Sequence, residues 1–262
     1  MSNEGVANSI IADPTPTISP APDTSVKLLR GLYDAENDIW HTTAYVRELN
    51  GEDEEVIASA NSKGDMSYAE YMSILLARAV EKIGTLDVTR DKSLVDKLMV
   101  GDRDLLFVGT VKATYGRVRE LEVICSSCGA KNFTTINLDE DFKIDTPTQD
   151  LQKPLEVTLK DNSVVKLNYP SGADSLYVAK KAKTTAEQNT LMLARCSVWD
   201  SHVEPFDKEE WAKALSLSDR NKLVKALTTD PPGPKMEEVK AQCAKCQEDL
   251  IILMDWVSLL FG

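Results

Sequence analysis

The sequence contains few residues of the kinds that enzymes commonly use for catalysis. Histidine occurs only at His41 and His202 among 262 residues, and neither lies in a ligand-like spacing. The nucleophile elbow G-x-S-x-G, the Walker A loop, the dinucleotide fingerprint and the zinc motif H-E-x-x-H are all absent. We therefore expect neither an enzyme nor a small-molecule substrate.

Basic residues are also scarce relative to acidic ones. There are 30 Lys and Arg residues against 42 Asp and Glu residues, which gives a formal net charge of −12. Binding to nucleic acid depends largely on Lys and Arg that displace counterions from the phosphates. The composition thus argues against a broad nucleic-acid surface and favours protein partners.

No hydrophobic run is long enough for a membrane span. The most apolar stretch lies at the C-terminus, in residues 250–254 and 256–261, and Asp255 interrupts it. The first residues, MSNEG, carry no positive charge followed by an apolar segment, so we expect no secretory signal. These features predict synthesis in a reducing cytoplasm.

Cysteine is limited to five residues, but four of them form two C-x-x-C pairs: Cys125 with Cys128, and Cys243 with Cys246. The two-residue spacer lets a tight turn aim both sulfur atoms of a pair at one point, and two such pairs supply the four thiolates of a tetrahedral Zn²⁺ site. Because four thiolates leave no open position, the predicted zinc is structural. The alternatives are that the pairs form disulfides or that they are turn cysteines that bind no metal. Cys196 stands alone in a predicted helix and is interpreted as a buried small apolar residue.

Local patterns predict a mixture of strands and helices. Alternation predicts a strand over residues 39–49, and an acidic cluster at 52–55 predicts the start of a short helix. The capping box SYAE at 67–70 precedes a helical pattern that continues to Gly84. A further short helix is expected over residues 102–108. Strands at 120–124 and 133–138 flank the first C-x-x-C turn and form a knuckle hairpin.

The second half of the sequence repeats the first. A shift of 117 places the capping box at 67–70 on TTAE at 184–187 and Asp102-Arg103 on Asp219-Arg220. One inserted residue moves the shift to 118, where Cys125 and Cys128 coincide with Cys243 and Cys246. Residues 47–51 also resemble residues 166–172, with a short insertion. A period this long indicates a duplicated domain rather than a solenoid repeat.

Duplication predicts the fold class and the domain boundaries. We expect an α+β protein of two similar modules about a pseudo-two-fold axis, joined by one four-cysteine zinc-ribbon-like site. An extended Pro-rich N-terminal arm spans residues 1–26, because Pro14, Pro16, Pro20 and Pro22 are spaced among small polar residues. The first module with its knuckle hairpin covers residues 27–145, and the second covers 146–262.

The C-terminal segment is the most apolar candidate surface for partner binding. Residues after Trp256 have no obvious burial requirement within a module, and an exposed apolar segment suits a protein interface. We therefore predict that residues of this segment bind a partner: Trp256, Leu259, Leu260 and Phe261. The alternative is that the segment is the last strand of the core.

The order of these motifs resembles the baseplate hub and hub-assembly proteins of contractile-tailed, myovirus-like bacteriophages. The similarity covers roughly residues 40–262 and is carried by a set of short motifs: VRELNGEDE at 46–54, GDRDLL at 101–106, YG at 115–116, CSSCG at 125–129, LSDR at 217–220, GP at 233–234, CAKC at 243–246 and Phe261. The family commonly ends in two phenylalanines, whereas this chain ends in Leu260-Phe261-Gly262.

The resemblance implies a structural virion component of the viral tail baseplate, at the hub, assembled in the host bacterial cytoplasm. Its partners would be other phage tail and baseplate proteins, and the two knuckles would be its metal-binding zinc site. An assembly chaperone that is not retained in the virion shares the resemblance. A nucleic-acid-binding zinc ribbon is the competing interpretation, although few basic residues lie near the knuckles.

Overall fold

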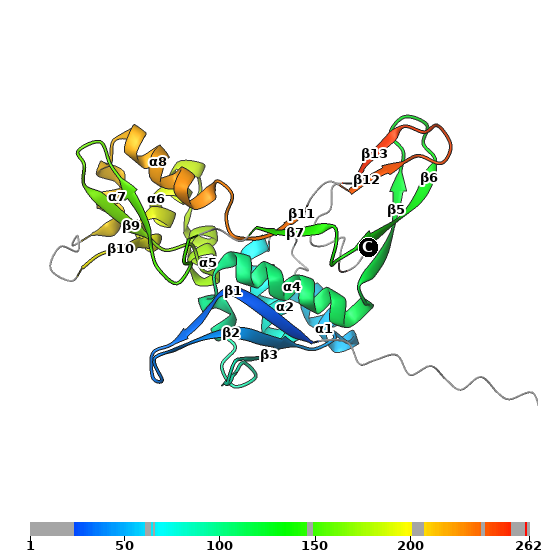
Figure 1. The fold of residues 1–262 in the computed structure, drawn as a ribbon, viewed down its shortest axis with the longest axis horizontal. Helices are drawn as coiled ribbons and strands as arrows, with labels where there is room; N and C mark the ends of the chain where they lie inside the picture. Colours follow the sequence, from blue (N-terminus) through cyan, green and yellow to red (C-terminus); the bar gives the residue numbers. More distant parts are fainter. Residues whose placement is uncertain are drawn as a thin grey trace, which may run out of the picture.

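A computed structural model describes residues 24–60, 64, 66–145, 149–200, 207–236, 239–252 and 260. The chain forms two mixed α/β units and a projecting arm of paired hairpins (Figure 1). We call residues 24–115 unit 1, residues 149–229 unit 2, and the hairpins that carry the C-x-x-C turns the knuckle arm. In the part of the chain that the structure describes, no helix has the length and apolar content needed to cross a bilayer.

Unit 1 is an antiparallel sheet covered by helices. Its sheet has the order β1-β2-β3-β4. The elements, in chain order, are β1 (Ser25–Asp34), β2 (Ile39–Val46), α1 (Gly51–Ala60), α2 (Tyr68–Ala79), β3 (Val80–Ile83), β4 (Leu86–Asp87), α3 (Leu94–Lys97) and α4 (Val100–Tyr115). The predicted capping box starts α2, because the Ser67 hydroxyl accepts from the Glu70 amide while the Glu70 carboxylate accepts from the Ser67 amide.

The core of unit 1 lies between this sheet and α2 and α4. Leu106, Phe107 and Val111 of α4 are fully buried, so α4 is the central helix rather than a surface helix. The same core continues under the base of the knuckle arm, where it includes Ile136. Unit 1 and the base of the arm therefore share one hydrophobic core.

Unit 2 has a similar order of elements on a smaller scale, without a counterpart of β4 among the described residues. Its sheet has the order β10-β9-β8. The elements are β8 (Leu155–Thr158), β9 (Val164–Leu167), α5 (Gly172–Lys181), α6 (Thr185–Cys196), β10 (Ser197–Val198), α7 (Lys208–Ala214) and α8 (Leu217–Thr228). A separate cluster of buried residues, including Leu167, Leu193 and Leu223, forms its core.

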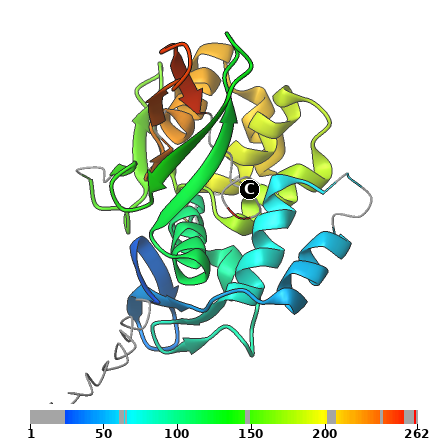
Figure 2. The ribbon, with the colours of Figure 1, turned by 90° about the vertical axis from the view of Figure 1, so that its right-hand side faces the viewer.

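The knuckle arm is built from both halves of the chain. Its hairpins are β5 (Val118–Ile124) with β6 (Lys131–Asn137), and β12 (Val239–Gln242) with β13 (Asp249–Ile252). A further antiparallel pair, β7 (Phe142–Asp145) with β11 (Gly233–Met236), links the strand after the first hairpin to the strand before the second. Figure 2 shows the two hairpins side by side.

Three sequence predictions about local structure need correction. The helix predicted to continue to Gly84 ends at Ala79, because residues 80–83 pair with β2 as strand β3. The short helix predicted at 102–108 is the 16-residue helix α4. Strand β1 begins at Ser25, within the predicted N-terminal arm, and residues 1–23 lie outside the described part of the chain.

Side-chain networks recur at corresponding places in the two units. The Asp53 carboxylate at the start of α1 accepts a hydrogen bond from Arg78 Nε at 2.6 Å, and Asp174 at the start of α5 accepts one from Arg195 Nε at 2.7 Å. Each carboxylate also closes the capping box of its own helix. The two helix starts are thus held by the same three-part arrangement.

A second network repeats with equal distances. Arg103 Nη2 donates to Ser73 Oγ at 2.8 Å, and Arg220 Nη2 donates to Thr190 Oγ1 at 2.8 Å. Both pairs are related by the shift of 117. Each arginine ties the fourth helix of its unit to the helix that begins with the Ser or Thr capping box.

The aspartate before each arginine binds a hairpin backbone. Asp102 is fully buried and accepts from three successive β1 amides, the last of them Gly31 at 2.8 Å. Burial raises the pKa of Asp102, although these amides oppose the shift. Asp219 accepts from the Lys160 amide at 3.1 Å, in the β8–β9 turn. Both carboxylates satisfy backbone donors that the sheet leaves unpaired.

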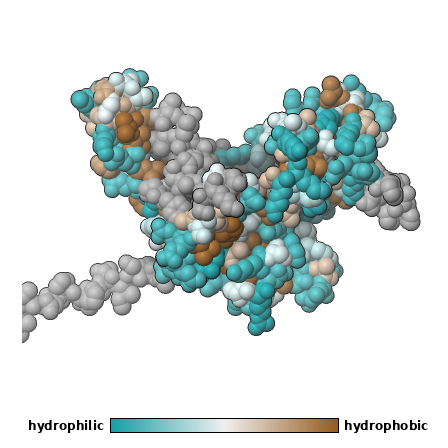
Figure 3. All heavy atoms as spheres, turned by 180° about the vertical axis from the view of Figure 1, so that it is seen from behind, coloured by the Kyte–Doolittle hydropathy of each residue, from teal (hydrophilic) through white to brown (hydrophobic). Residues whose placement is uncertain are grey.

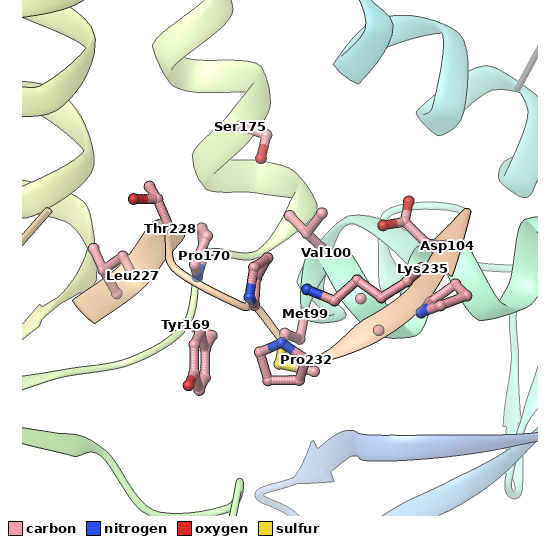
Figure 4. Close-up of a pocket in the computed structure, with 14 residues that line it drawn as sticks. Met99, Val100, Asp104, Tyr169, Pro170, Ser175, Leu227, Thr228, Pro232 and Lys235 are labelled. Carbon is pink, nitrogen blue, oxygen red and sulfur yellow. The ribbon is translucent and has the colours of Figure 1, made fainter. Parts of the chain in front are cut away.

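The joint between the units is not symmetric. We call residues 98–101 of unit 1 its head loop and residues 170–172 of unit 2 its tail loop. These two loops contact each other. Two backbone hydrogen bonds of 3.0 Å hold the loops together, from Val100 N–H to Pro170 O and from Gly172 N–H to Leu98 O. A cavity of about 350 Å³ lies beside this joint (Figure 4).

Candidate metal centre

The two C-x-x-C turns converge although 114 residues separate them in the sequence. The four sulfur atoms all lie within 4.8 Å of one another. Cys125 Sγ is 3.6 Å from Cys246 Sγ, and Cys128 Sγ is 3.6 Å from Cys243 Sγ. Since Cys125 corresponds to Cys243 and Cys128 to Cys246, these two cross-contacts are symmetry mates. The two cross-contacts are thus equal in length, and each joins the first cysteine of one knuckle to the second cysteine of the other.

Each knuckle is shaped by one local turn. The amide after the second cysteine donates to the carbonyl of the first, from Gly129 to Cys125 at 2.9 Å and from Gln247 to Cys243 at 2.8 Å. Both donors have left-handed backbone, with φ of 68° at Gly129 and 61° at Gln247. Glycine adopts this conformation without steric strain, whereas the Cβ of glutamine makes it sterically unfavourable. The second knuckle thus makes the turn of the first despite its less suitable residue.

The electrostatics of the site favour ionised sulfur on one cysteine and oppose it on another. The backbone amides of Cys246 and Lys245 lower the pKa of the Cys243 thiol to about 6. The Glu248 amide lowers the pKa of Cys246, but burial and the neighbouring sulfurs of Cys128, Cys243 and Cys125 together outweigh it and raise that pKa to about 12. Four adjacent thiols cannot all ionise together without a cation between them.

The donor set fits Zn²⁺. A zinc ion with Zn–S bonds of about 2.3 Å has sulfur atoms roughly 3.8 Å apart at the corners of a tetrahedron. The separations in this cluster, from 3.6 Å for the cross-contacts to no more than 4.8 Å, bracket that value. They are too long for disulfide bonds, which need about 2.05 Å. The four thiols could hold one metal ion with no position left for water or substrate.

A polar contact that the sequence did not reveal joins the two knuckles directly. The Asn132 side chain is 7 % exposed, donates to the Ala130 carbonyl at 3.0 Å, and accepts from the Ala244 amide at 2.9 Å. In the second half, the corresponding position is Leu250, which is buried beside the cysteines. Because positions 132 and 250, which the shift of 118 relates, hold an asparagine and a leucine, no repeated sequence pattern indicated this contact.

The basic residues next to the C-x-x-C turns lie among acidic residues. Lys131 forms an ion pair with Glu122 at 2.8 Å, so this charge is already matched. Lys245 is followed by the exposed acids Glu248 and Asp249. The space-filling view in Figure 3 shows one face of the molecule, which is largely hydrophilic with separate hydrophobic patches on the arm and on the units.

The remaining sulfur and imidazole groups have structural surroundings. Cys196 is 2 % exposed in the unit 2 core, and burial raises the pKa of its thiol to about 12. A thiol with such a pKa is a poor nucleophile at neutral pH. His41 is 7 % exposed and lies 3.6 Å from the Asp34 carboxylate. His202 lies outside the described residues.

The predicted partner-binding residues are described only in part. Trp256, Leu259 and Phe261 fall outside the described residues. Leu260 is 1 % exposed and packs in the unit 1 core. The expectation that residues after Trp256 need no burial is wrong for Leu260, and partner binding by this segment stays a prediction.

Comparison with known proteins gives one match. A family profile described as "T4 bacteriophage base plate protein" matches residues 37–261. Neither the curated proteins nor the solved structures gave a significant match. The matched range contains all four cysteines of the metal centre.

Proposed function

The chain belongs to the T4 bacteriophage base plate protein family, and from this premise we propose that it is a non-enzymatic structural component of the hub region of a contractile-tail baseplate. Its partners are then other tail and baseplate proteins, and its location is the virion tail after assembly in the host cytoplasm. The observation that carries the proposal is the family match over residues 37–261. The acidic surface and the closed four-thiol centre are compatible with it.

The metal centre acts in this proposal as a structural clasp. The unit 1 core reaches under the β5–β6 hairpin, while the second knuckle follows unit 2 in the chain. One zinc ion on Cys125, Cys128, Cys243 and Cys246 therefore fixes the C-terminal half of the chain against the first half. Removing it should free the hairpins from each other as well as destabilise their turns.

We also infer that the chain arose by duplication of one module. The support is the common order of elements, the symmetric meeting of the knuckles and the three side-chain networks found in both units. Under this inference the first module spans residues 27–145, the second spans 146–262, and residues 1–26 form an N-terminal arm. The zinc joins equivalent elements of the two copies.

Detection of the chain in purified virions tests the structural role. A structural component co-purifies with tails at a constant ratio to other baseplate proteins, whereas an assembly chaperone is needed for tail formation but absent from finished particles. A phage lacking residues after Trp256 tests the C-terminal segment separately. Baseplates formed at wild-type yield would exclude partner docking by Leu259 and Phe261.

A nucleic-acid-binding zinc ribbon is the second candidate, favoured only by the four-cysteine centre. Fluorescence polarisation with labelled DNA and RNA at low salt decides this point, because even non-specific binding is strongest there. The net charge of −12 predicts no binding. Saturable binding that weakens steeply with added salt would support the zinc-ribbon function instead.

A further inference from the structure

The joint uses the head loop of unit 1 and the tail loop of unit 2. The corresponding loops, in unit 2 and in unit 1 respectively, take no part in it. In unit 2 the counterpart of the head loop is residues 215–218, and in unit 1 the counterpart of the tail loop is residues 49–51. These two loops do not meet: Leu217, the counterpart of Val100, is 77 % exposed, and Gly51 is exposed at the start of α1. A two-fold joint would have used both pairs of loops, so this joint is head-to-tail.

The backbone groups that form the joint have counterparts in the other two loops. In the joint, the Val100 and Gly172 amides donate to the Pro170 and Leu98 carbonyls. Within the described residues, no backbone or side-chain bond engages the four corresponding groups: the Leu217 and Gly51 amides and the Leu49 and Leu215 carbonyls. The two free loops therefore present the same donors and acceptors as the loops of the joint.

The glycine at position 51 is a second, independent indication that this loop can bind a head loop. A Cβ at Gly172 would lie 1.3 Å from Arg103 Nη1, so the joint requires glycine there. A Cβ at Gly51 would meet nothing within 4 Å. The packing of the described residues therefore leaves room for a side chain at position 51. Arg220 of unit 2 corresponds to Arg103 of unit 1, and each arginine donates to the corresponding Thr190 or Ser73 hydroxyl. If the head loop of unit 2 docked in the same way, Arg220 would lie against Gly51.

Residues 49–51 of unit 1 also lie beside a cavity that has room for the Leu217 side chain of a docked head loop. A cavity of about 500 Å³ opens beside it, lined in part by Leu49, Gly51 and Glu54. In the joint, Val100 lies beside Pro170 and Ser175, at the cavity drawn in Figure 4. Leu217 would enter the unit 1 cavity at the corresponding place, where its exposed apolar surface would be removed from water.

We propose that the head loop of unit 2 docks on the tail loop of unit 1 in a second copy of this chain. The resulting contact repeats the joint between copies and gives head-to-tail self-association, either as a ring or as an open chain. It is weaker than the joint, because Ser218 replaces Gly101. A Cβ at Gly101 would lie 1.8 Å from Pro232 O, so the close backbone contact at that point is not reproduced.

Sedimentation of the full-length, zinc-loaded chain over a dilution series tests the proposal. We expect a weight-average mass that rises above the 28.9 kDa of the monomer as concentration increases. Leu217→Asp and Gly51→Leu should each hold the mass at that of the monomer, and both positions are open in the monomer, so the fold should tolerate them. Val164→Asp, at a residue 54 % exposed elsewhere on unit 2, is the matched control and should associate like the wild type.

Mixing the two variants distinguishes this interface from others. The Leu217→Asp chain keeps a working tail loop and the Gly51→Leu chain keeps a working head loop, so an equimolar mixture should form dimers and nothing larger. A wild-type chain that stays monomeric at its highest soluble concentration would overturn the proposal. So would association that neither variant reduces, or a mixture that stays monomeric.

Discussion

Replacing Asp53 by alanine is expected to destabilise unit 1 by about 3 kcal/mol at pH 7. The Asp53 carboxylate is fully buried and accepts from Arg47 Nη1 at 2.7 Å, from Arg47 Nη2 at 2.9 Å and from Arg78 Nε at 2.6 Å. It also accepts from the Asn50 amide at 3.0 Å. Breaking a fully buried pair costs about 3–5 kcal/mol. The lower end applies, because Arg47 and Arg78 are 32 % and 21 % exposed and can turn toward water.

The corresponding variant of unit 2, Asp174→Ala, is the control. Asp174 accepts from Arg195 alone among the arginines of the described residues, and Arg195 is 40 % exposed, so the expected loss is about 1 kcal/mol. Urea unfolding of wild type and both variants at pH 7 measures the differences. Equal losses for the two variants would refute the argument that the buried network of unit 1 carries more stability.

The pH dependence gives a further check on Asp53. The Arg47 and Asn50 hydrogen bonds hold the pKa of Asp53 far below its usual range, so its stabilisation is present above about pH 4 and is lost as the pH falls through the folded-state pKa. The gap between wild type and Asp53→Ala should narrow by about 1 kcal/mol between pH 5 and pH 3. A constant gap would show that the carboxylate charge contributes nothing.

Four more substitutions have defined outcomes. Burial raises the pKa of Asp104 to about 6, so wild-type stability should fall as the pH rises from about 4 to about 6; Asp104→Asn should stabilise the protein by on the order of 2 kcal/mol at pH 7 and by nothing below pH 4, as measured by urea unfolding. Gln247→Gly should stabilise the second knuckle by about 1 kcal/mol, and Gly129→Gln should destabilise the first by a similar amount. Thermal unfolding in the presence of a competing chelator measures both changes. Leu260→Ala should lower the unfolding free energy of unit 1 by about 2 kcal/mol, and an unchanged midpoint would mean that the unit 1 core does not depend on this side chain.

Sequence patterns predicted the parts of the fold that depend on local chemistry. The capping boxes before α2 and α6 fixed the starts of both helices, and the spacing of the cysteine pairs predicted the two hairpin turns. The constant shift of 117 to 118 residues predicted that the distant knuckles would meet. All four predicted metal ligands lie within one cluster.

Elements that depend on tertiary contacts were missed or misplaced. Glu81 and Lys82 favour a helix, but pairing with β2 makes their segment the strand β3. Strand β1 shows no regular alternation, because its register shifts between Lys27 and Leu32, where buried Asp102 accepts hydrogen bonds from the backbone amides. The asymmetric joint could not be predicted either, since a repeat specifies that two surfaces are alike without specifying which of them meet.

Metal analysis of the purified, fully reduced protein tests the central claim most directly. The account predicts one zinc ion per chain, bound by Cys125, Cys128, Cys243 and Cys246. It further predicts that Cys128→Ser in the first knuckle and Cys243→Ser in the second each lower the zinc content, whereas Cys196→Ser leaves it unchanged. A zinc content well below one per chain with intact thiols, or full retention after loss of either ligand, would contradict a single shared clasp.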